Sequence, residues 1–259
     1  MPALVEVRGL HFRYGKASLR DRTEPWTLTD LTLDIDADST LGIVGESGSG
    51  KSTLIRVLAG LLRHQQGDVT FDGRDLKEWL DRSPRELRQR NQIVFQSPRR
   101  SLDPRMNIRR ALGQPVRALE RRKPTDAELA EWLARVGLGT EILPRFPHQL
   151  SGGQLQRIGI ARALSVGPNV LYADEPVSAL DVSVQAQVLN LLMDVRAQLG
   201  LTLVMVSHDL GVVSRLCEHV IVLKNGVIVE AGRTSEVLAN PSDPYTASLV
   251  TAARAVSLK

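Results

Sequence analysis

The sequence predicts an α/β fold: a doubly wound core of strands and helices with a helical insertion. Two observations support this prediction. Strand-length apolar runs and amphipathic helix-length stretches occur over residues 4–71 and again over residues 169–229. Between these two regions, residues 83–167 show a mostly helical pattern. No internal repeat and no low-complexity segment interrupts this organisation.

The composition is that of a globular chain and argues against several classes of protein. The 259 residues are 42% hydrophobic and 24% charged, which allows a sizeable buried core. The longest apolar runs, such as residues 201–206, fall far short of the roughly 18 residues that span a bilayer. The N-terminus lacks a charged start followed by an apolar stretch, so we expect no secretion signal. The single cysteine, Cys217, excludes an internal disulfide, fits a reducing compartment and is typical of a small apolar residue.

The net charge of +4 and the pI of about 9.5 would permit contact with nucleic acid or anionic lipid. The basic residues are dispersed, however, and only 4% of the residues are aromatic, too few for a platform on which bases stack. We therefore interpret the charge mainly as solvated surface and expect no nucleic-acid partner.

The first part of the chain predicts three strands before a helix. Residues 4–12, 28–35 and 40–44 have strand-like patterns, with a polar loop over residues 15–27. A helix is expected over residues 51–62, with one apolar face made of Leu54, Val57, Leu58 and Leu61. Residues 68–71 then have the pattern of a strand that ends at a turn formed by Asp72 and Gly73.

Two capping boxes indicate helix starts within the helical block. Thr125 and Glu128 have the required spacing, and an apolar stripe follows them at Leu129, Trp132, Leu133 and Val136. The same spacing recurs at Ser151 and Gln154, which predicts a helix with Leu155 and Ile158 facing inward. The backbone N–H groups and the positive dipole end of such a helix are available to an anion.

The last part of the chain returns to alternating strands and helices. A buried strand is expected over residues 169–173, a helix that stops at Gly200, and another strand over residues 202–206. Strands over residues 220–223 and 227–229 flank Asn225 and Gly226, a strong signal for a type I′ hairpin. Residues 234–259 predict one or two short helices, broken near Pro241 and Pro244.

A phosphate-binding loop is predicted at the start of the first helix. Residues 45–52 match the pattern GxxxxGK(S/T) in full, after a strand and before a helix. Lys51 would contact the β- and γ-phosphates of a nucleotide, and the Ser52 hydroxyl would bind Mg²⁺. The alternative is a glycine- and serine-rich loop with a surface lysine. The expected ATP-binding residues of this loop are Gly45, Glu46, Ser47, Gly48, Ser49, Gly50, Lys51, Ser52 and Thr53.

Two carboxylates follow the apolar residues 170–173. Asp174 is placed to hold Mg²⁺ through water, and Glu175 is placed to act as the general base on the attacking water. Alone, such a pair is as typical of a helix cap that follows a strand. Downstream of a phosphate loop, the pattern favours an ATPase site.

Residues 150–154 read LSGGQ and lie between the phosphate loop and the acidic strand. Other residues stand in a fixed order around them: Tyr14, Gln96, Asp181 within the SALD segment of residues 178–181, and His208. Taken singly, Tyr14 would be a tyrosine at a strand edge and Gln96 the polar end of a strand. Asp181 would be a helix cap and His208 a structural histidine. Taken together in this order, the motifs resemble those of ATP-binding cassette (ABC) ATPases from residue 4 to about residue 232.

The resemblance implies a P-loop NTPase (RecA-like) core over residues 1–92 and 168–232, which includes an N-terminal antiparallel β-subdomain. It also implies a helical signature subdomain over residues 93–167 and a C-terminal tail over residues 233–259. Together these form a single ABC ATPase domain.

The resemblance also assigns roles to single residues. Tyr14 would stack on adenine, Gln96 would reach Mg²⁺ and the attacking water, and His208 would contact the γ-phosphate. The catalytic set is then Glu175, His208, Lys51 and Gln96, and the metal set is Ser52, Gln96 and Asp174. The signature of one subunit would serve ATP held by its partner, so the expected contacts in trans are Ser151, Gly152, Gly153, Gln154 and Asp181.

Residues 96–106, 174–190 and 240–246 look like the oligopeptide, dipeptide and nickel importer branch of this family. This resemblance implies ATP and Mg²⁺ as cofactors, a second ATPase subunit that is identical or a related sister, two transmembrane permeases and, indirectly, a solute-binding protein. The ATPase would lie on the cytoplasmic face of the membrane as a peripheral subunit, driving uptake of peptides or a related small solute, nickel included. Some longer members carry a cysteine cluster after the tail. This chain has none, so we expect no iron–sulfur centre.

Three other classes of ABC protein are compared with this interpretation. ABC ATPases of DNA repair carry long heptad insertions, and translation-type factors normally hold two cassettes in one chain, whereas this sequence has neither feature. An ABC-like subunit of a soluble phosphonate-cleaving complex has similar motifs and stays open as the alternative. Co-purification with permeases or with soluble lyase subunits would separate the two.

Overall fold

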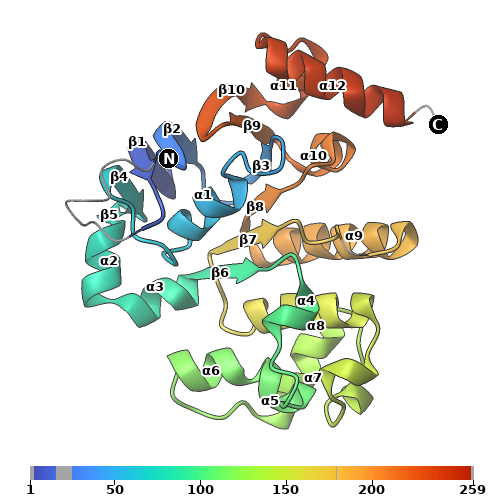
Figure 1. Ribbon diagram of the computed structural model, residues 1–259. Coiled ribbons are helices and arrows are strands. Elements are labelled where there is room, and N and C mark those ends of the chain that lie inside the picture. The colour runs from blue at the N-terminus through green and yellow to red at the C-terminus, as the bar shows by residue number, and fades with distance from the viewer. Residues whose placement is uncertain (1–2, 16–24, 179, 258–259) are drawn as a thin grey trace. The chain divides into compact units, whose positions relative to one another are not determined.

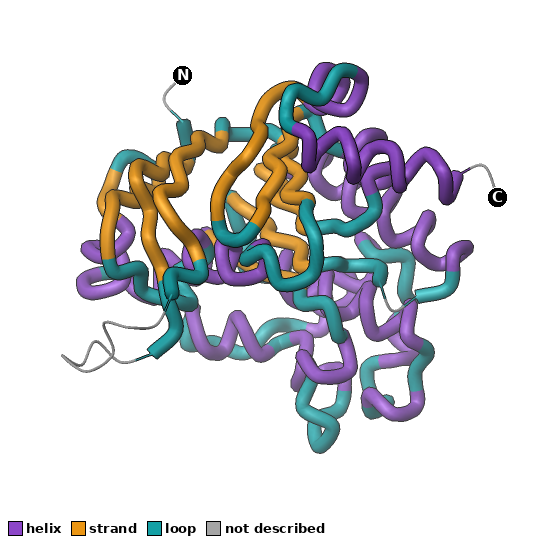
Figure 2. The backbone as a smooth tube through the Cα atoms, turned by 45° about the horizontal axis from the view of Figure 1, so that its top comes forward, coloured by secondary structure: helices purple, strands orange, loops and turns teal. Residues whose placement is uncertain are grey.

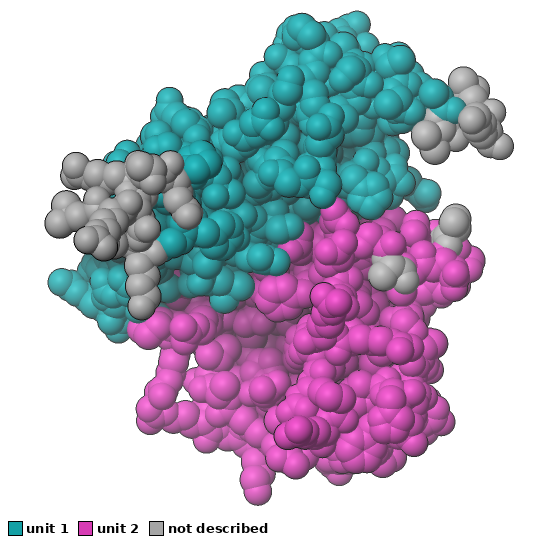
Figure 3. Space-filling model, viewed as in Figure 1, with its two compact units in different colours: residues 1–83, 204–259 teal, residues 84–203 magenta. Residues whose placement is uncertain are grey.

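The computed structural model describes residues 3–15, 25–178 and 180–257. Most of the polar loop expected over residues 15–27 therefore lies outside the described residues, as does Ala179 of the SALD segment. The chain forms two compact units: residues 1–83 with 204–259, and residues 84–203 (Figure 3). The finer division into core, signature subdomain and tail that the sequence predicts stays a prediction.

The first unit contains an antiparallel sheet built mainly from the N-terminal residues (Figure 1). Its strand order is β2-β1-β4-β5, with β1 (Val5–Phe12), β2 (Leu28–Ile35), β4 (Gln66–Phe71) and β5 (Arg74–Asp75). Val5 pairs with Ile35 on one side and Phe71 on the other, which sets the register of the three long strands. Asp72 and Gly73 both have positive φ angles, of 52° and 71°, as the tight turn between β4 and β5 requires. The expected N-terminal antiparallel subdomain is present.

A second group of strands in this unit leads to the phosphate loop. The buried strand β3 (Thr40–Val44) runs parallel to β9 (His219–Lys224), which pairs antiparallel with β10 (Val227–Arg233). Asn225 and Gly226 have φ angles of 49° and 77°, which confirms the predicted type I′ hairpin. Figure 2 shows these strands in orange.

The helices described in the first unit are α1 (Lys51–Leu58), α2 (Leu76–Arg82), α10 (Leu210–Leu216), α11 (Thr234–Ala239) and α12 (Pro244–Ser257), and β8 (Thr202–Val206) lies where the chain enters this unit again. Four of these helices have eight residues or fewer, and α12 has 14. The prediction that the first helix reaches Leu62 was wrong. Gly60 has a φ of 71°, so the helix ends before it and Leu61 is 47% exposed. The two tail helices are as predicted.

The second unit is mostly helical and packs around α8 (Gly152–Leu164). Its other elements are α3 (Pro84–Arg90), β6 (Asn91–Val94), α4 (Pro98–Ser101), α5 (Ile108–Leu112), α6 (Gln114–Leu119), α7 (Asp126–Arg135), β7 (Val170–Asp174), α9 (Val182–Leu199) and two 3₁₀ turns, Thr140–Ile142 and Pro147–Gln149. β6 and β7 pair in parallel, from Asn91 with Val170 to Val94 with Ala173. The apolar stripe of α7 and both inward residues of α8 are buried, as predicted.

Two expectations about the environment of the chain can be compared with the structure. Among the described residues, no helix is both long and apolar enough to pass through a bilayer. Cys217 is buried at the end of α10, and burial raises the pKa of its thiol to about 12. The thiolate is therefore disfavoured, in agreement with the interpretation of Cys217 as a packed apolar residue.

Candidate nucleotide site

The phosphate loop connects β3 to α1, and its backbone needs glycine at defined positions. Gly45, Gly48 and Gly50 have φ angles of 148°, 83° and 104°, in the region that other residues rarely adopt. At Gly45 there is also no space, because a Cβ atom would lie 2.1 Å from the carbonyl oxygen of Leu223. The segment from Glu46 to Gly48 is exposed, so the loop is open to a ligand.

The lysine of the loop is held by the loop's own carbonyl groups. Lys51 is only 6% exposed, and its Nζ donates hydrogen bonds of 2.8 Å to the Gly45 carbonyl and 2.7 Å to the Glu46 carbonyl. Gly50, the N-cap residue of α1, provides no side-chain cap. The first-turn N–H groups of α1 are therefore not used by a capping side chain, which suits an anion.

Tyr14 lies beside the phosphate loop. Its hydroxyl is 3.1 Å from Oγ1 of Thr53, and its ring meets that of Phe12 edge-on with centroids 5.0 Å apart. The side chain nevertheless remains 47% exposed. An exposed aromatic ring beside the loop suits the adenine contact that the sequence predicts, and that role stays a prediction.

His208 also lies in the first unit, directly after β8. The N–H of Ser207 donates a 3.2 Å hydrogen bond to the carbonyl of Ile43, next to the point where β3 ends and the phosphate loop begins. Asp209 then caps α10 by accepting from the N–H groups of Gly211 and Val212. The structure thus places Tyr14, the phosphate loop and the segment carrying His208 in the same unit.

The acidic strand end forms a polar cluster in the second unit. β7 is buried along its length and ends at Asp174, which is 3% exposed. Glu175 follows with a φ of 46°, an uncommon conformation for a residue other than glycine. Nε2 of Gln96 donates 2.7 Å to the Glu175 carboxylate and 3.3 Å to Oγ of Ser178. The Ser178 hydroxyl in turn donates 3.2 Å to the Glu175 carbonyl, so Glu175 accepts one hydrogen bond at its side chain and another at its backbone.

The signature begins α8 with the predicted capping box. The Ser151 hydroxyl accepts from the Gln154 N–H at 3.2 Å, and the Gln154 side chain accepts from the Ser151 N–H at 3.0 Å. Neither Gly152 nor Gly153 has a positive φ. A Cβ at Gly153 would lie 2.6 Å from Cγ1 of Val184, and one at Gly152 would lie 3.3 Å from the Leu180 side chain. Both glycines therefore allow close packing, Gly152 against Leu180 just before α9 and Gly153 against Val184 in its first turn.

Asp181 stands at the N-cap position of α9, yet its side chain makes no capping hydrogen bond and is exposed. The helix-cap interpretation therefore accounts for its backbone position only. Gln154 and Asp181 thus belong to adjacent segments of one unit, in keeping with a shared surface.

Sequence reasoning missed one residue at the phosphate loop. The hydroxyl of Tyr245, at the start of α12, accepts a 2.9 Å hydrogen bond from the N–H of Glu46. The only available signal was the Pro-Tyr-Thr segment of the tail, which indicated a family branch and no contact.

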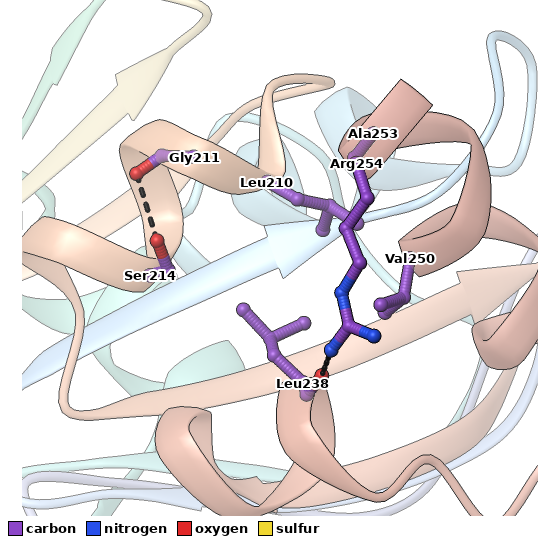
Figure 4. Close-up of a pocket in the computed structure, with 7 residues that line it drawn as sticks. All are labelled: Leu210, Gly211, Ser214, Leu238, Val250, Ala253 and Arg254. Atoms are coloured by element: carbon purple, nitrogen blue, oxygen red, sulfur yellow. Dashed lines mark hydrogen bonds between the residues drawn. The ribbon is translucent and has the colours of Figure 1, made fainter. Parts of the chain in front are cut away.

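A separate open pocket of about 500 Å³ lies among α10, α11 and α12 and is lined by Leu210, Gly211, Ser214, Leu238, Val250, Ala253 and Arg254 (Figure 4). It contains none of the predicted site residues.

A glycine-rich loop that turns from a buried strand into a helix, with its lysine folded over it, is the phosphate-binding loop of a P-loop NTPase. The ABC transporter family model matches residues 28–178 of the chain, more than half of its length. The chain is 45% identical over 226 residues to the oligopeptide transport ATP-binding protein OppF of Salmonella typhimurium, covering 86% of this chain and 67% of that protein. It is 42% identical over 258 residues to OppF of Haemophilus influenzae, covering 96% and 77%.

The fold is also similar to a solved dimeric ATP-binding cassette, MJ0796, in a post-hydrolysis state bound to ADP and Pi. The TM-score is 0.75 at 28% identity, and the match covers 89% of this chain and 98% of that chain. The chain belongs to the ABC transporter family and is an ATPase of the P-loop NTPase fold. The family, the fold class and the ATPase activity predicted from the sequence are confirmed.

Proposed function

We propose that the protein is the ATP-binding subunit of an importer that takes up peptides or a related small solute, nickel included. The relatives named for oligopeptide transport support this assignment, together with the importer-like segments over residues 96–106 and 174–190. The matched relatives give no support to the alternative, a subunit of a phosphonate-cleaving complex. Partner permeases would hold the ATPase on the cytoplasmic face of the membrane as a peripheral subunit.

The main structural support for the proposed hydrolytic mechanism is the hydrogen-bonded cluster of Gln96, Glu175 and Ser178. A carboxylate that accepts a short hydrogen bond from Gln96 and sits on a constrained backbone is suited to orient a water molecule. Lys51 and His208 would stabilise the charge that develops on the γ-phosphate, because phosphoryl transfer is catalysed mainly by positioning and electrostatics. Tyr14 would contact adenine.

The chemistry of the residues fits a magnesium ion bound with ATP. The Ser52 hydroxyl, the Gln96 amide and the Asp174 carboxylate all provide the oxygen ligands that Mg²⁺ prefers. When bound, Mg²⁺ would neutralise negative charge on the β- and γ-phosphates. The protein's own part is to present these oxygens from the start of α1, from the segment after β6 and from the end of β7.

A dimer would complete each ATP site. Ser151, Gly152, Gly153, Gln154 and Asp181 would meet ATP held by a second ATPase subunit, either an identical copy or a sister. The dimeric state of the solved cassette MJ0796 supports this part of the proposal. Because the capping box takes up the N–H groups of Ser151 and Gln154, the γ-phosphate would meet those of Gly152 and Gly153.

Replacing the proposed base tests the mechanism. Glu175→Gln keeps the shape of the side chain and removes its basicity, so we expect ATP hydrolysis to fall by about 10²- to 10⁴-fold while ATP binding persists. Steady-state phosphate release and equilibrium binding of ATP measure the two effects. Glu131→Gln, at an exposed surface pair on α7, is the matched control and should change neither. Near-normal hydrolysis by Glu175→Gln would exclude this residue as the base.

The transport assignment needs a different experiment. We expect the protein, affinity-purified from mild detergent extracts of its native membranes, to retain two transmembrane permease subunits identified by mass spectrometry. Co-purification with soluble lyase subunits instead would favour the phosphonate-cleaving complex.

A further inference from the structure

The tail segment after α11 is fixed to β10 by one carboxylate. The side chain of Glu230 accepts hydrogen bonds of 2.8 Å from both the N–H and the hydroxyl of Ser242, and one of 3.2 Å from the N–H of Asp243. Burial alone would raise the pKa of Glu230, but hydrogen bonds from Ser242 and its neighbours outweigh it and lower the pKa. The carboxylate is therefore charged at neutral pH and holds the tail firmly.

The next residues of the tail start α12 in a defined orientation. Asp243 accepts from the N–H groups of Tyr245 and Thr246 at 2.8 and 3.4 Å, and Pro244 stands at the first position of the helix. Tyr245 is then only 8% exposed, with the Lys224 ammonium 4.6 Å from the centroid of its ring. These contacts fix both the backbone and the ring plane of Tyr245.

The hydroxyl of this fixed ring reaches the first turn of the phosphate loop. It accepts the N–H of Glu46 at 2.9 Å, across 199 residues of sequence. The carbonyl of the same residue, Glu46, accepts the ammonium of Lys51 at 2.7 Å. Glu46 is thus held by Tyr245 at its N–H and holds the loop lysine at its carbonyl. A rotation of the Glu46 backbone would change both contacts together.

We propose that Tyr245 is a positioning residue for ATP hydrolysis, which sets the orientation of Glu46 and, through it, the place of the Lys51 ammonium. The proposal rests on the assignment of residues 45–53 as the ATP-binding loop. It gives the tail a role at the nucleotide site in addition to its packing within the first unit. Tyr245 itself need not touch ATP.

The test removes a single oxygen atom. Tyr245→Phe keeps the ring, its burial and its contact with Lys224, and leaves the Glu46 N–H without its acceptor. We expect amide hydrogen exchange at Glu46 to become about tenfold faster, and the KM for ATP to rise about 3- to 10-fold with a smaller change in kcat, as one lost hydrogen bond allows. Tyr172→Phe is the matched control, because Tyr172 is a buried tyrosine whose hydroxyl has no hydrogen-bond partner among the described residues.

A second variant reaches the same contact without changing Tyr245. Glu230→Gln weakens the anchor of the tail, so we expect Glu46 exchange and the KM for ATP to rise in the same direction by a smaller factor. If both variants leave Glu46 exchange and ATP affinity at the level of Tyr172→Phe, Tyr245 only packs α12 and the proposal is wrong.

The exchange measurement also separates this proposal from the assignment of the loop. It is made on the protein without ATP, so it reports the Tyr245–Glu46 hydrogen bond alone. Lys51→Ala tests the loop independently, through a loss of ATP binding. If Lys51→Ala bound ATP normally while Tyr245→Phe accelerated exchange, the ATP-binding assignment would fail and the structural contact would stand.

Discussion

The chain contains two glycine-rich segments that each begin a helix, one in each unit, and their glycines are required for different reasons. In the phosphate loop, Gly45, Gly48 and Gly50 all have positive φ angles, so the backbone conformation itself excludes most side chains. In the signature, Gly152 and Gly153 have ordinary φ angles, and the limit is the space next to Leu180 and Val184. Glycine therefore permits a curved backbone, which we propose binds phosphate, in one unit and close packing of segments in the other.

The two helix starts also differ in their caps. Gly50 offers no side chain to α1, whereas Ser151 and Gln154 cap α8 reciprocally. A loop that wraps phosphates needs its N–H groups for the ligand, so a capping side chain would compete with it. A helix start that is presented to another subunit must hold its shape alone, and the capping box supplies that rigidity. The difference suits the two roles proposed here, own-site binding and contact in trans.

The largest effect is expected from a side chain at Gly45. Gly45→Ala combines an unfavourable φ of 148° with a Cβ that would lie 2.1 Å from a backbone oxygen. We expect ATP affinity to fall by about 100-fold or more, because strain and steric overlap both displace the loop. Isothermal titration with ATP measures this loss.

Gly48→Ala is the matched comparison within the same loop. It has a positive φ of 83° but open space around the added Cβ, so only the backbone strain remains, about 1–2 kcal/mol. Its loss of ATP affinity should be about tenfold. Equal losses in the two variants would mean that the contact with Leu223 does not matter.

A smaller effect is expected at the signature, where space is the limit. Gly153→Ala would place a methyl group 2.6 Å from Cγ1 of Val184, and we expect a loss of about 1–3 kcal/mol in the free energy of unfolding. The double variant Gly153→Ala with Val184→Ala should recover most of that loss, since the second change removes the overlapping atom. Chemical denaturation measures both. Absence of recovery would show that backbone conformation, and not space, requires Gly153.

The features that the sequence predicted correctly differ from those that it did not in how far apart the residues involved lie along the chain. Both capping boxes, the type I′ turn at Asn225 and Gly226, and the stop of α9 at Gly200 were predictable because each depends on residues next to one another in sequence. The end of α1 was not, because the apolar pattern continues to Leu61 although Gly60 has already left the helix. The contact of Tyr245 with Glu46 could not be predicted from local sequence patterns, because 199 residues separate the two.

The sequence allowed the residues of the candidate site to be named, but not the contacts and backbone conformations that hold them in place. The order of the motifs named Gln96 and Glu175, yet the hydrogen bond between them and the positive φ of Glu175 appear only in the structure. Likewise, LSGGQ shows that two glycines are present and does not show that they are needed for space. Side-chain packing across segments decides such questions, and a single sequence carries no direct signal of it.

The smallest expected effect separates capping from contact with a partner. Ser151→Ala and Thr125→Ala each remove the hydroxyl of a complete capping box in the second unit, so each should lower the free energy of unfolding by about 0.5–2 kcal/mol. If the signature meets ATP in trans, only Ser151→Ala should also lower ATP hydrolysis beyond what its stability loss explains. Thr125 caps a different helix, α7, and is not part of the signature, so Thr125→Ala serves as the control for a lost cap. Activity measured well below the unfolding midpoint isolates this difference, and equal activities in the two variants would leave Ser151 with a structural role alone.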